Sequence, residues 1–309
     1  MAGGRTVTPA DLATVVAITV TPFDDAGALD EPGLARVVDR LVDGGIRVVV
    51  PAGNTSEYHA LGEQEWQRSV ALTVERAGHR AIVMPGIGRD LATAVRQAES
   101  AFELGCMSVM VHQPVDPFIS AEGWLAYHAR IHAAVPDLAL VAYVRDARRS
   151  VEDVVRLSET EGILGVKYAI ADPPSFADLV AATDPSSVAL VCGLAERWAV
   201  PFAASGAVGF TSGLAGIVPR LSLDIAACLD AGDFAKAREL VAIAAGLELL
   251  RARDGSAYNV AAVKEGLAQL GVCGRTVRPP ASELPAGLRP VVTDFLRAAG
   301  AVMGGEVVA

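Results

Sequence analysis

Short apolar segments of strand length recur along the chain, and a segment with helical spacing follows each of them. The strand-like segments are rich in β-branched residues and do not alternate between apolar and polar positions. This pattern is typical of parallel strands that are buried on both faces. The predicted strands cover 15–20, 47–50, 81–85, 107–112, 138–143, 163–169, 188–192 and 208–212.

The helical segments alternate with these strands without a break. Ser120 and Ser150 precede two of them as expected N-caps, and Gly44 with Gly45 ends another. The predicted helices cover 30–43, 63–77, 91–104, 120–133, a segment after Ser150, 174–182, 196–205 and a segment that Pro219 opens. Eight such units predict an α/β fold, a (β/α)₈ TIM barrel, with a doubly wound open sheet as the alternative.

The strand pattern stops near residue 230, and three further helical segments follow at 233–253, 256–270 and 288–299. We therefore expect an N-terminal arm over 1–14 with a helical turn near Pro9, a barrel over 15–230 and a C-terminal helical extension over 231–309. The extension is too small to be expected as a separate domain.

Composition narrows the class of protein. Hydrophobic residues make up 52% of the 309 positions, charged residues 20%, and the net charge is −10. A large core is therefore expected, and a nucleic-acid-binding surface is not. The four cysteines are far apart, and neither a signal peptide nor a transmembrane segment is apparent. These features predict a cytoplasmic protein with reduced thiols and no membrane partner.

One residue in the predicted strand 163–169 suggests chemistry. Lys167 lies within an apolar run, and the chain has only two other lysines, Lys236 and Lys264. Burial lowers the pKa of an amine and makes it a nucleophile that forms Schiff bases with carbonyl groups. An ordinary lysine at a strand end, paired with a carboxylate, is the alternative interpretation.

In barrels of this type the active site lies where the strands end. Tyr143 ends the strand next to that of Lys167, so its phenol could exchange protons with the amine. The loop 53–57 offers hydroxyl groups and backbone amides suited to a carboxylate, although its residues also suit an ordinary turn. The candidate site residues at the strand ends are Thr21, Asn54, Thr55, Ser56, His112, Tyr143, Lys167, Gly193 and Thr211.

Three arginines, Arg145, Arg148 and Arg149, follow Tyr143 closely. One of them could hold a second carboxylate of a substrate in a forked pair, or they could form a solvated face. His128 and His132 are four residues apart on a predicted helix and have the spacing of metal ligands. No third ligand is apparent nearby, so we expect two partly exposed histidines and no metal.

Thr21-Pro22-Phe23, the loop 53–57, Tyr143 and Gly165-Val166-Lys167 together resemble the dihydrodipicolinate synthase / N-acetylneuraminate lyase family. The resemblance extends from about residue 15 to the C-terminal helices. It implies a lyase in which Lys167 forms a Schiff base with a 2-oxo acid and Tyr143 moves the proton. It also implies that Thr55 and its loop bind the oxo-acid carboxylate, that Gly193 and Thr211 line the pocket, and that the protein is a homotetramer or dimer.

The departures from the family pattern bear on the reaction. Asn54 and Ser56 replace a hydroxyl residue and a glycine of the usual loop, and Val115 with Asp116 replaces a tyrosine pair that the synthases use in a proton relay. Arg148 still falls where the synthases bind a substrate carboxylate. The run Tyr143-Val144-Arg145-Asp146 is similar to that of the 5-dehydro-4-deoxyglucarate dehydratases.

These features favour an aldolase or dehydratase that acts on a pyruvate-related or sugar-acid-derived 2-oxo acid, without a dissociable cofactor. Two alternatives stay open within the family: dihydrodipicolinate synthase proper, and a catalytically weak member that binds 2-oxo acids or regulates. A metal-dependent aldolase on the same barrel is a third, for which no carboxylate–histidine cluster is apparent.

Overall fold

The computed structural model describes residues 6–302, so the outermost parts of the predicted arm (1–5) and extension (303–309) lie outside the described residues. Nine parallel strands form one sheet in the order β3-β2-β1-β9-β8-β7-β6-β5-β4. They are β1 (Val15–Ile18), β2 (Val48–Val50), β3 (Ile82–Val83), β4 (Gly86–Ile87), β5 (Ser108–Val111), β6 (Ala139–Val144), β7 (Ile163–Tyr168), β8 (Ala189–Cys192) and β9 (Gly209–Ser212).

The sheet closes on itself because β3 and β4 are two halves of one interrupted strand. The backbone N–H of Met84 donates to Val49 of β2 at 3.0 Å, and the N–H of Met110 of β5 donates to Pro85 at 2.9 Å. The segment 82–87 therefore bonds to a neighbour on each side. The predicted eight-stranded barrel is confirmed, and the open-sheet alternative is wrong.

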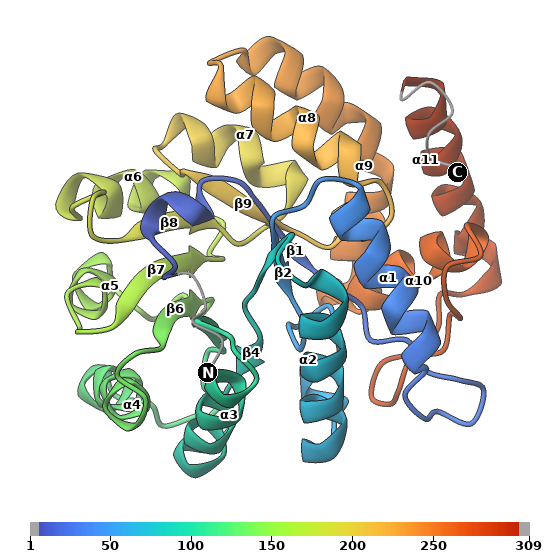
Figure 1. Cartoon of the computed structure of the whole chain (residues 1–309). Helices are drawn as coiled ribbons and strands as arrows, with labels where there is room; N and C mark the ends of the chain where they lie inside the picture. The colour runs from blue at the N-terminus through green and yellow to red at the C-terminus, as the bar shows by residue number, and fades with distance from the viewer. Residues whose placement is uncertain (1–5, 303–309) are drawn as a thin grey trace.

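Eight helices surround the barrel, each following one strand of the eight-stranded barrel (Figure 1). The Ser120 and Ser150 side chains cap α4 and α5 as predicted, accepting from the N–H groups of Gly123 and Asp153. The helices are α1 (Glu31–Asp43), α2 (Glu63–Ala77), α3 (Leu91–Glu103), α4 (Ala121–Ala134), α5 (Val151–Ser158), α6 (Pro173–Ala182), α7 (Glu196–Ala204) and α8 (Pro219–Asp230).

Both faces of the strands are buried, which explains their unbroken apolar sequences. Val16 and Ile18 face the barrel interior, where they belong to the same cluster as Tyr143, whereas Val15 and Ala17 pack against the surrounding helices. A 3₁₀ turn, η1 (Pro9–Leu12), lies within the arm near Pro9 as predicted and places Leu12 in the interior cluster. The interior is thus filled with side chains, and the free space lies at its mouth.

The predicted extension forms α9 (Phe234–Ser256), α10 (Asn259–Gln269), a 3₁₀ turn η4 (Ala286–Leu288) and α11 (Arg289–Val302). Helix α9 packs against α7, α8, α10 and α11, and its regular geometry breaks at residues 253–255. The extension therefore joins the barrel through an extensive contact (Figure 1). No helix in residues 6–302 is long and apolar enough to cross a membrane.

Candidate active site

Lys167 and Tyr143 meet at the mouth of the barrel because β6 and β7 are paired in register. Their Cα atoms are direct partners in the parallel ladder. The Lys167 ammonium nitrogen lies 4.1 Å from the centroid of the Tyr143 ring. Both side chains line a cavity of about 520 Å³. The pairing expected from the order of the strands is therefore present.

The environment of Lys167 favours a neutral amine. Its side chain is buried, and it makes no hydrogen bond or ion pair with another described residue. Burial is the main cause that lowers the pKa of this amine to about 7, and the Arg145 guanidinium adds to the effect. A cation nearby disfavours the protonated form. A large fraction of the amine is thus unprotonated near neutral pH and can act as a nucleophile.

Tyr143 is held by the loop that follows β2. The Asn54 side-chain amide donates a hydrogen bond to the Tyr143 hydroxyl at 3.3 Å. Because Asn54 donates, the Tyr143 hydroxyl hydrogen is left to point to another acceptor, and the cavity is the space it faces. Burial raises the pKa of Tyr143, so the phenol keeps its proton at neutral pH.

The loop 53–57 presents hydrogen-bond donors to the same cavity. The backbone N–H groups of Asn54 and Thr55 make no hydrogen bond with any described residue, nor does the Thr55 hydroxyl. Gly53 is required where it stands, since an added Cβ would collide with the Ile18 side chain. Two free amides and a hydroxyl in one tight loop are donors of the kind that bind a carboxylate, and this role stays a prediction.

Ser56 and Thr21 hold this loop from behind. The Ser56 hydroxyl donates to the Thr19 carbonyl at 2.6 Å and accepts from the Gly53 N–H at 3.1 Å. The Thr21 hydroxyl donates to the Ser56 carbonyl at 2.7 Å. Neither residue lines the cavity. Their geometry therefore supports a role in shaping the loop, and direct contact with substrate stays a prediction.

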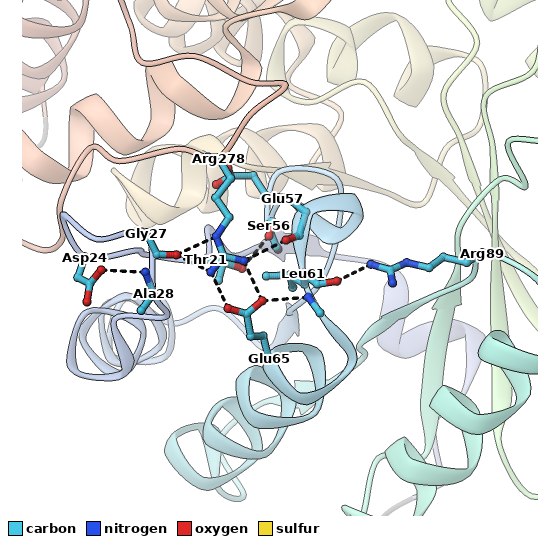
Figure 2. A network of polar contacts seen from close by, with 12 residues as sticks. Thr21, Asp24, Gly27, Ala28, Ser56, Glu57, Leu61, Glu65, Arg89 and Arg278 are labelled. Carbon is cyan, nitrogen blue, oxygen red and sulfur yellow. Dashed lines mark hydrogen bonds and ion pairs between the residues drawn. The ribbon is translucent and has the colours of Figure 1, made fainter.

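Glu57 attaches the loop to the C-terminal extension. Its backbone has the left-handed φ of 57°, and its carboxylate pairs with Lys264 of α10 at 2.5 Å. The same carboxylate accepts the backbone N–H of Arg278 at 2.9 Å. Figure 2 shows Arg278 reaching from the extension across the loop to Glu65 of α2 and the Gly27 carbonyl. The extension thus fixes the loop from outside the barrel.

Gly193 and Thr211 lie where the strand ends predicted them, in the wall of the large cavity. A Cβ at Gly193 would meet the Ala169 side chain at 2.7 Å and the Tyr168 carbonyl at 2.9 Å. Only glycine therefore lets β8 approach β7 this closely beside Lys167. Their predicted part in lining the substrate pocket agrees with this placement.

His112 faces a smaller adjoining cavity of about 340 Å³. Its ring stacks on Tyr58 with the centroids 4.2 Å apart, and its Nε2 lies 2.9 Å from the Ala52 carbonyl oxygen. Burial lowers the pKa of this imidazole to about 3, so it stays neutral. These contacts support a structural role, and contact with substrate stays a prediction.

Arg148 also borders the smaller cavity but is turned toward solvent. Its guanidinium pairs with Asp146 at 2.8 Å, and 60% of its side chain is exposed. Arg145, by contrast, lines both cavities and has no hydrogen bond or ion pair within the described chain. Of the three arginines after Tyr143, Arg145 is the one whose charge acts on Lys167.

The expectation of two partly exposed histidines on α4 is wrong for His128. This side chain is buried, with its Nδ1 2.9 Å from the Trp124 carbonyl, and burial lowers its pKa to about 4. His132 is half-buried as expected. Within residues 6–302 no group of three or more His, Cys, Asp or Glu side chains could hold a metal.

Several cavity residues come from elements to which no role was assigned. Helix α9 contributes Glu248 and Arg251, α10 contributes Asn259, and α7 contributes Arg197 and Trp198. Periodicity indicates only that these segments are helical, so the sequence carried no signal that they bend over the barrel mouth.

Comparison with known proteins decides the family. The profile of the dihydrodipicolinate synthetase family matches residues 11–299. The chain belongs to this family. It is 30% identical over 292 residues to the 4-hydroxy-tetrahydrodipicolinate synthase of Methylococcus capsulatus, which covers 93% of this chain and 98% of the relative. It is 31% identical over 271 residues to a probable 5-dehydro-4-deoxyglucarate dehydratase of Streptomyces avermitilis, covering 85% and 86%.

Solved structures agree with this assignment. The crystal structure of dihydrodipicolinate synthase from Bacillus clausii superposes with a TM-score of 0.90 at 35% identity, covering 94% of this chain and 98% of the other. The corresponding protein from Oceanobacillus iheyensis gives a TM-score of 0.91 at 33% identity, with coverage of 95% and 98%. The predicted family and the predicted class, a lyase, are confirmed.

Proposed function

We propose that this member of the family is a Schiff-base lyase, an aldolase or dehydratase, that forms an imine between Lys167 and a 2-oxo acid. One observation carries the proposal. An amine whose pKa is lowered to about 7 faces a cavity beside a protonated phenol, 4.1 Å from its ring, and has no competing partner among the described residues. Such perturbed groups in a cavity are typical of catalytic sites.

The loop 53–57 positions the oxo acid. The free N–H groups of Asn54 and Thr55 and the Thr55 hydroxyl donate hydrogen bonds to the C1 carboxylate, which brings the C2 carbonyl to the amine. Gly193 and Thr211 form the wall behind it. Holding the two reacting groups together in this way removes much of the entropic cost of imine formation.

The steps use the two side chains in turn. The neutral Lys167 amine attacks C2, and the Tyr143 hydroxyl gives its proton to the carbonyl oxygen, so that a carbinolamine forms. The nitrogen then loses a proton to the Tyr143 oxygen. The Tyr143 hydroxyl gives this proton to the carbinolamine hydroxyl, which leaves as water, and a protonated imine remains beside the Tyr143 phenolate. This cation accepts the electron pair released when a C–C bond breaks, or when a C3 proton is removed before a hydroxyl leaves.

Asn54 favours a lyase or dehydratase that acts on another 2-oxo acid over the synthase reaction, which uses a proton relay. An amide donates to the Tyr143 oxygen but cannot pass a proton onward as a hydroxyl does. Relatives of this chain are named as a synthase and as a dehydratase, so both activities occur close to it. The synthase reaction and a binding protein without turnover are the alternatives that the test below separates.

Borohydride trapping tests the proposal. The protein is incubated with pyruvate or another 2-oxo acid, reduced, and examined by intact mass and peptide mapping. We expect one adduct per chain, on Lys167, and none in Lys167→Met. Turnover of a trapped substrate to a new carbonyl product shows a lyase, and consumption of pyruvate only after aspartate semialdehyde is added shows the synthase reaction. Trapping without either kind of turnover shows a binder. A folded protein that gives no adduct with any 2-oxo acid would contradict the proposal.

We propose further that the enzyme acts in the cytoplasm, as a homo-oligomer and without a dissociable cofactor. The four cysteines are all unpaired, which suits a reducing compartment. The exposed apolar side chains of Val115 and Phe118 support self-association.

A further inference from the structure

The cavity contains a second cation, Arg251, whose position is unusually well defined. Its side chain is only 7% exposed. One terminal nitrogen, Nη1, donates to Glu248 at 2.6 Å, while Nε and Nη2 donate to the Asn259 side-chain oxygen at 3.0 Å and 2.7 Å. Partners on two helices, α9 and α10, therefore fix the plane of the guanidinium.

These contacts leave part of the guanidinium unused. An arginine side chain carries five N–H groups, and the bonds to described residues account for three, one on each nitrogen. One N–H is left on each terminal nitrogen, so the guanidinium can still donate two charge-assisted hydrogen bonds to a carboxylate. Because a buried donor without an acceptor is costly, a bound oxygen ligand would stabilise this arrangement.

Arg251 also lies close to the loop that is proposed to hold the C1 carboxylate. A Cβ built on Gly213, at the end of β9, would lie 2.8 Å from the Arg251 Nη2 and 3.1 Å from the Thr55 Cγ2. The guanidinium thus reaches the cavity through space that only glycine leaves open. A ligand attached to Lys167 and held by Thr55 occupies the same cavity.

The surrounding charge favours an anion although the whole protein is acidic. Glu248 offsets the charge of Arg251, but Arg145 and Arg197 line the same cavity and have no ion-pair partner within residues 6–302. The net charge of the chain is −10, so the excess of positive charge is confined to this cavity and is not a property of the whole protein. It attracts a ligand that carries more than one negative group.

We infer that Arg251, held by Glu248 and Asn259, binds a second carboxylate of the substrate, and that the substrate is therefore a 2-oxo diacid. This inference rests on the proposed function, in which the C1 carboxylate occupies the loop 53–57. Arg251 is then a specificity-determining residue contributed by the C-terminal extension. A site built around a fixed hydrogen-bonding group rejects an analogue that lacks the matching group.

The test compares acids of equal length that differ only in the distal carboxylate. Half-saturating concentrations for borohydride trapping are measured for 2-oxoglutarate against 2-oxopentanoate, and for 2-oxoadipate against 2-oxohexanoate, with pyruvate as the common reference. For at least one pair, we expect the half-saturating concentration of the diacid with wild type to be lower than that of the monoacid by a factor of about ten or more.

Two variants remove the contact in different ways. Glu248→Gln/Arg251→Met removes both charges together, so that no unpaired carboxylate is left buried. Gly213→Ala keeps the charges and displaces the guanidinium. In each, the diacid preference should fall to about twofold or less while pyruvate is still trapped on Lys167. Arg253→Met is the matched control, because this arginine lies on the same helix, is 55% exposed and does not line the cavity.

The outcomes separate this inference from the proposed function. Adducts on Lys167 without any diacid preference in wild type would overturn the inference alone. A preference that survives in the Glu248→Gln/Arg251→Met variant would show Arg251 to be only a partner for Glu248. Equal weakening of diacids and monoacids would place Arg251 on the C1 carboxylate. No adduct with any acid in wild type would overturn the proposed function and, with it, this inference.

Discussion

At the scale of single residues, the candidate site depends on how burial changes the pKa of ordinary side chains. Of the three lysines, Lys236 is exposed and pairs with Glu239, whereas Lys264 is buried and pairs with Glu57. Lys167 is buried without a carboxylate partner. A buried cation without a counterion is unstable, so the amine gives up its proton. The difference among the three lies in their surroundings and not in their chemistry.

The lowered pKa of Lys167 predicts how imine formation depends on pH. Only the neutral amine attacks, so the rate of pyruvate trapping should rise through pH 6 to 8 with a midpoint near 7 and then level off. Arg145 disfavours the protonated amine, so Arg145→Gln should raise the pKa of Lys167 and move the midpoint to higher pH. Initial trapping rates under saturating pyruvate measure this directly.

Arg156→Gln serves as the control for this shift, since Arg156 lies on α5 and pairs with Glu122 at the surface. Its midpoint should match wild type. A midpoint near the ordinary lysine value in wild type would show that the amine is paired or solvated in solution. An unchanged midpoint in Arg145→Gln would show that burial alone lowers the pKa.

Site residues at strand ends could be predicted from the sequence. Residues whose place in the site depends on how distant helices pack could not. Lys167 and Tyr143 follow from a strand order that periodicity reveals. Arg251 lies on a long helix, and its place at the barrel mouth depends on how that helix packs. Arg148 has the expected sequence position but turns to Asp146 and solvent, because its loop lets the two side chains pair locally.

At the scale of elements, the loop 53–57 is a rigid part whose supports come from distant segments. Ser56 fixes it to the segment that follows β1, and Glu57 fixes it to α10 through Lys264. The strained φ of Glu57 is tolerated because its carboxylate has these partners. Rigid support of this kind keeps the free N–H groups of the loop aimed at the cavity.

Breaking the buried pair between the loop and α10 should destabilise the protein and weaken substrate binding. Lys264→Met leaves Glu57 buried without its cation, which is expected to cost about 3–5 kcal/mol of unfolding free energy. Urea denaturation at pH 7 measures this cost, and the half-saturating pyruvate concentration in trapping reports the loosened loop.

Two further variants test whether the unpaired buried charge causes the loss of stability in Lys264→Met. Glu57→Gln/Lys264→Met removes both charges and should recover part of the lost stability. Lys236→Met removes an exposed lysine that pairs with Glu239 at the surface and should leave the unfolding free energy close to that of wild type. Equal costs for Lys264→Met and Lys236→Met would contradict the assigned importance of the buried pair.

The elements themselves were largely predictable, because parallel strands and amphipathic helices leave a strong apolar pattern. The exceptions have physical reasons. The predicted strand 81–85 is interrupted at Met84 and Pro85, and its pairing continues to Ile87, beyond the predicted end of the strand. His128 lies four residues before His132, which is the spacing of two metal ligands on a helix. Its ring is nevertheless packed edge-on against Trp124 and Tyr127.

At the scale of the whole molecule, the barrel supplies the reactive pair and the extension completes the cavity. Helix α9 brings Arg251 over the mouth, and Arg278 ties the extension to α2 and the loop (Figure 2). The extension therefore forms part of the wall of the candidate site. A sequence pattern can show that three helices follow a barrel, but it cannot show that they cover the site, since that depends on contacts between distant segments.

The molecule also exposes an apolar loop beside the site. Between β5 and α4, Phe118 is 92% exposed and Val115 is 76% exposed. Large apolar side chains in such positions indicate a contact surface, and Val115 also borders the smaller cavity. In a symmetric dimer this loop of one chain meets the same loop of the other chain. Each apolar side chain of the loop would then be buried once in each of the two chains.

We therefore predict that Phe118→Asp weakens self-association. Burying a phenylalanine contributes about 1.5–3 kcal/mol per chain, so the dimer dissociation constant should rise by roughly a hundredfold or more. Sedimentation velocity over a dilution series measures the change. Leu249→Asp is the control, because it places a charge on another exposed apolar position, on α9. A monomeric wild type, or equal masses for wild type and Phe118→Asp at every dilution, would contradict the assignment of this loop to a subunit interface.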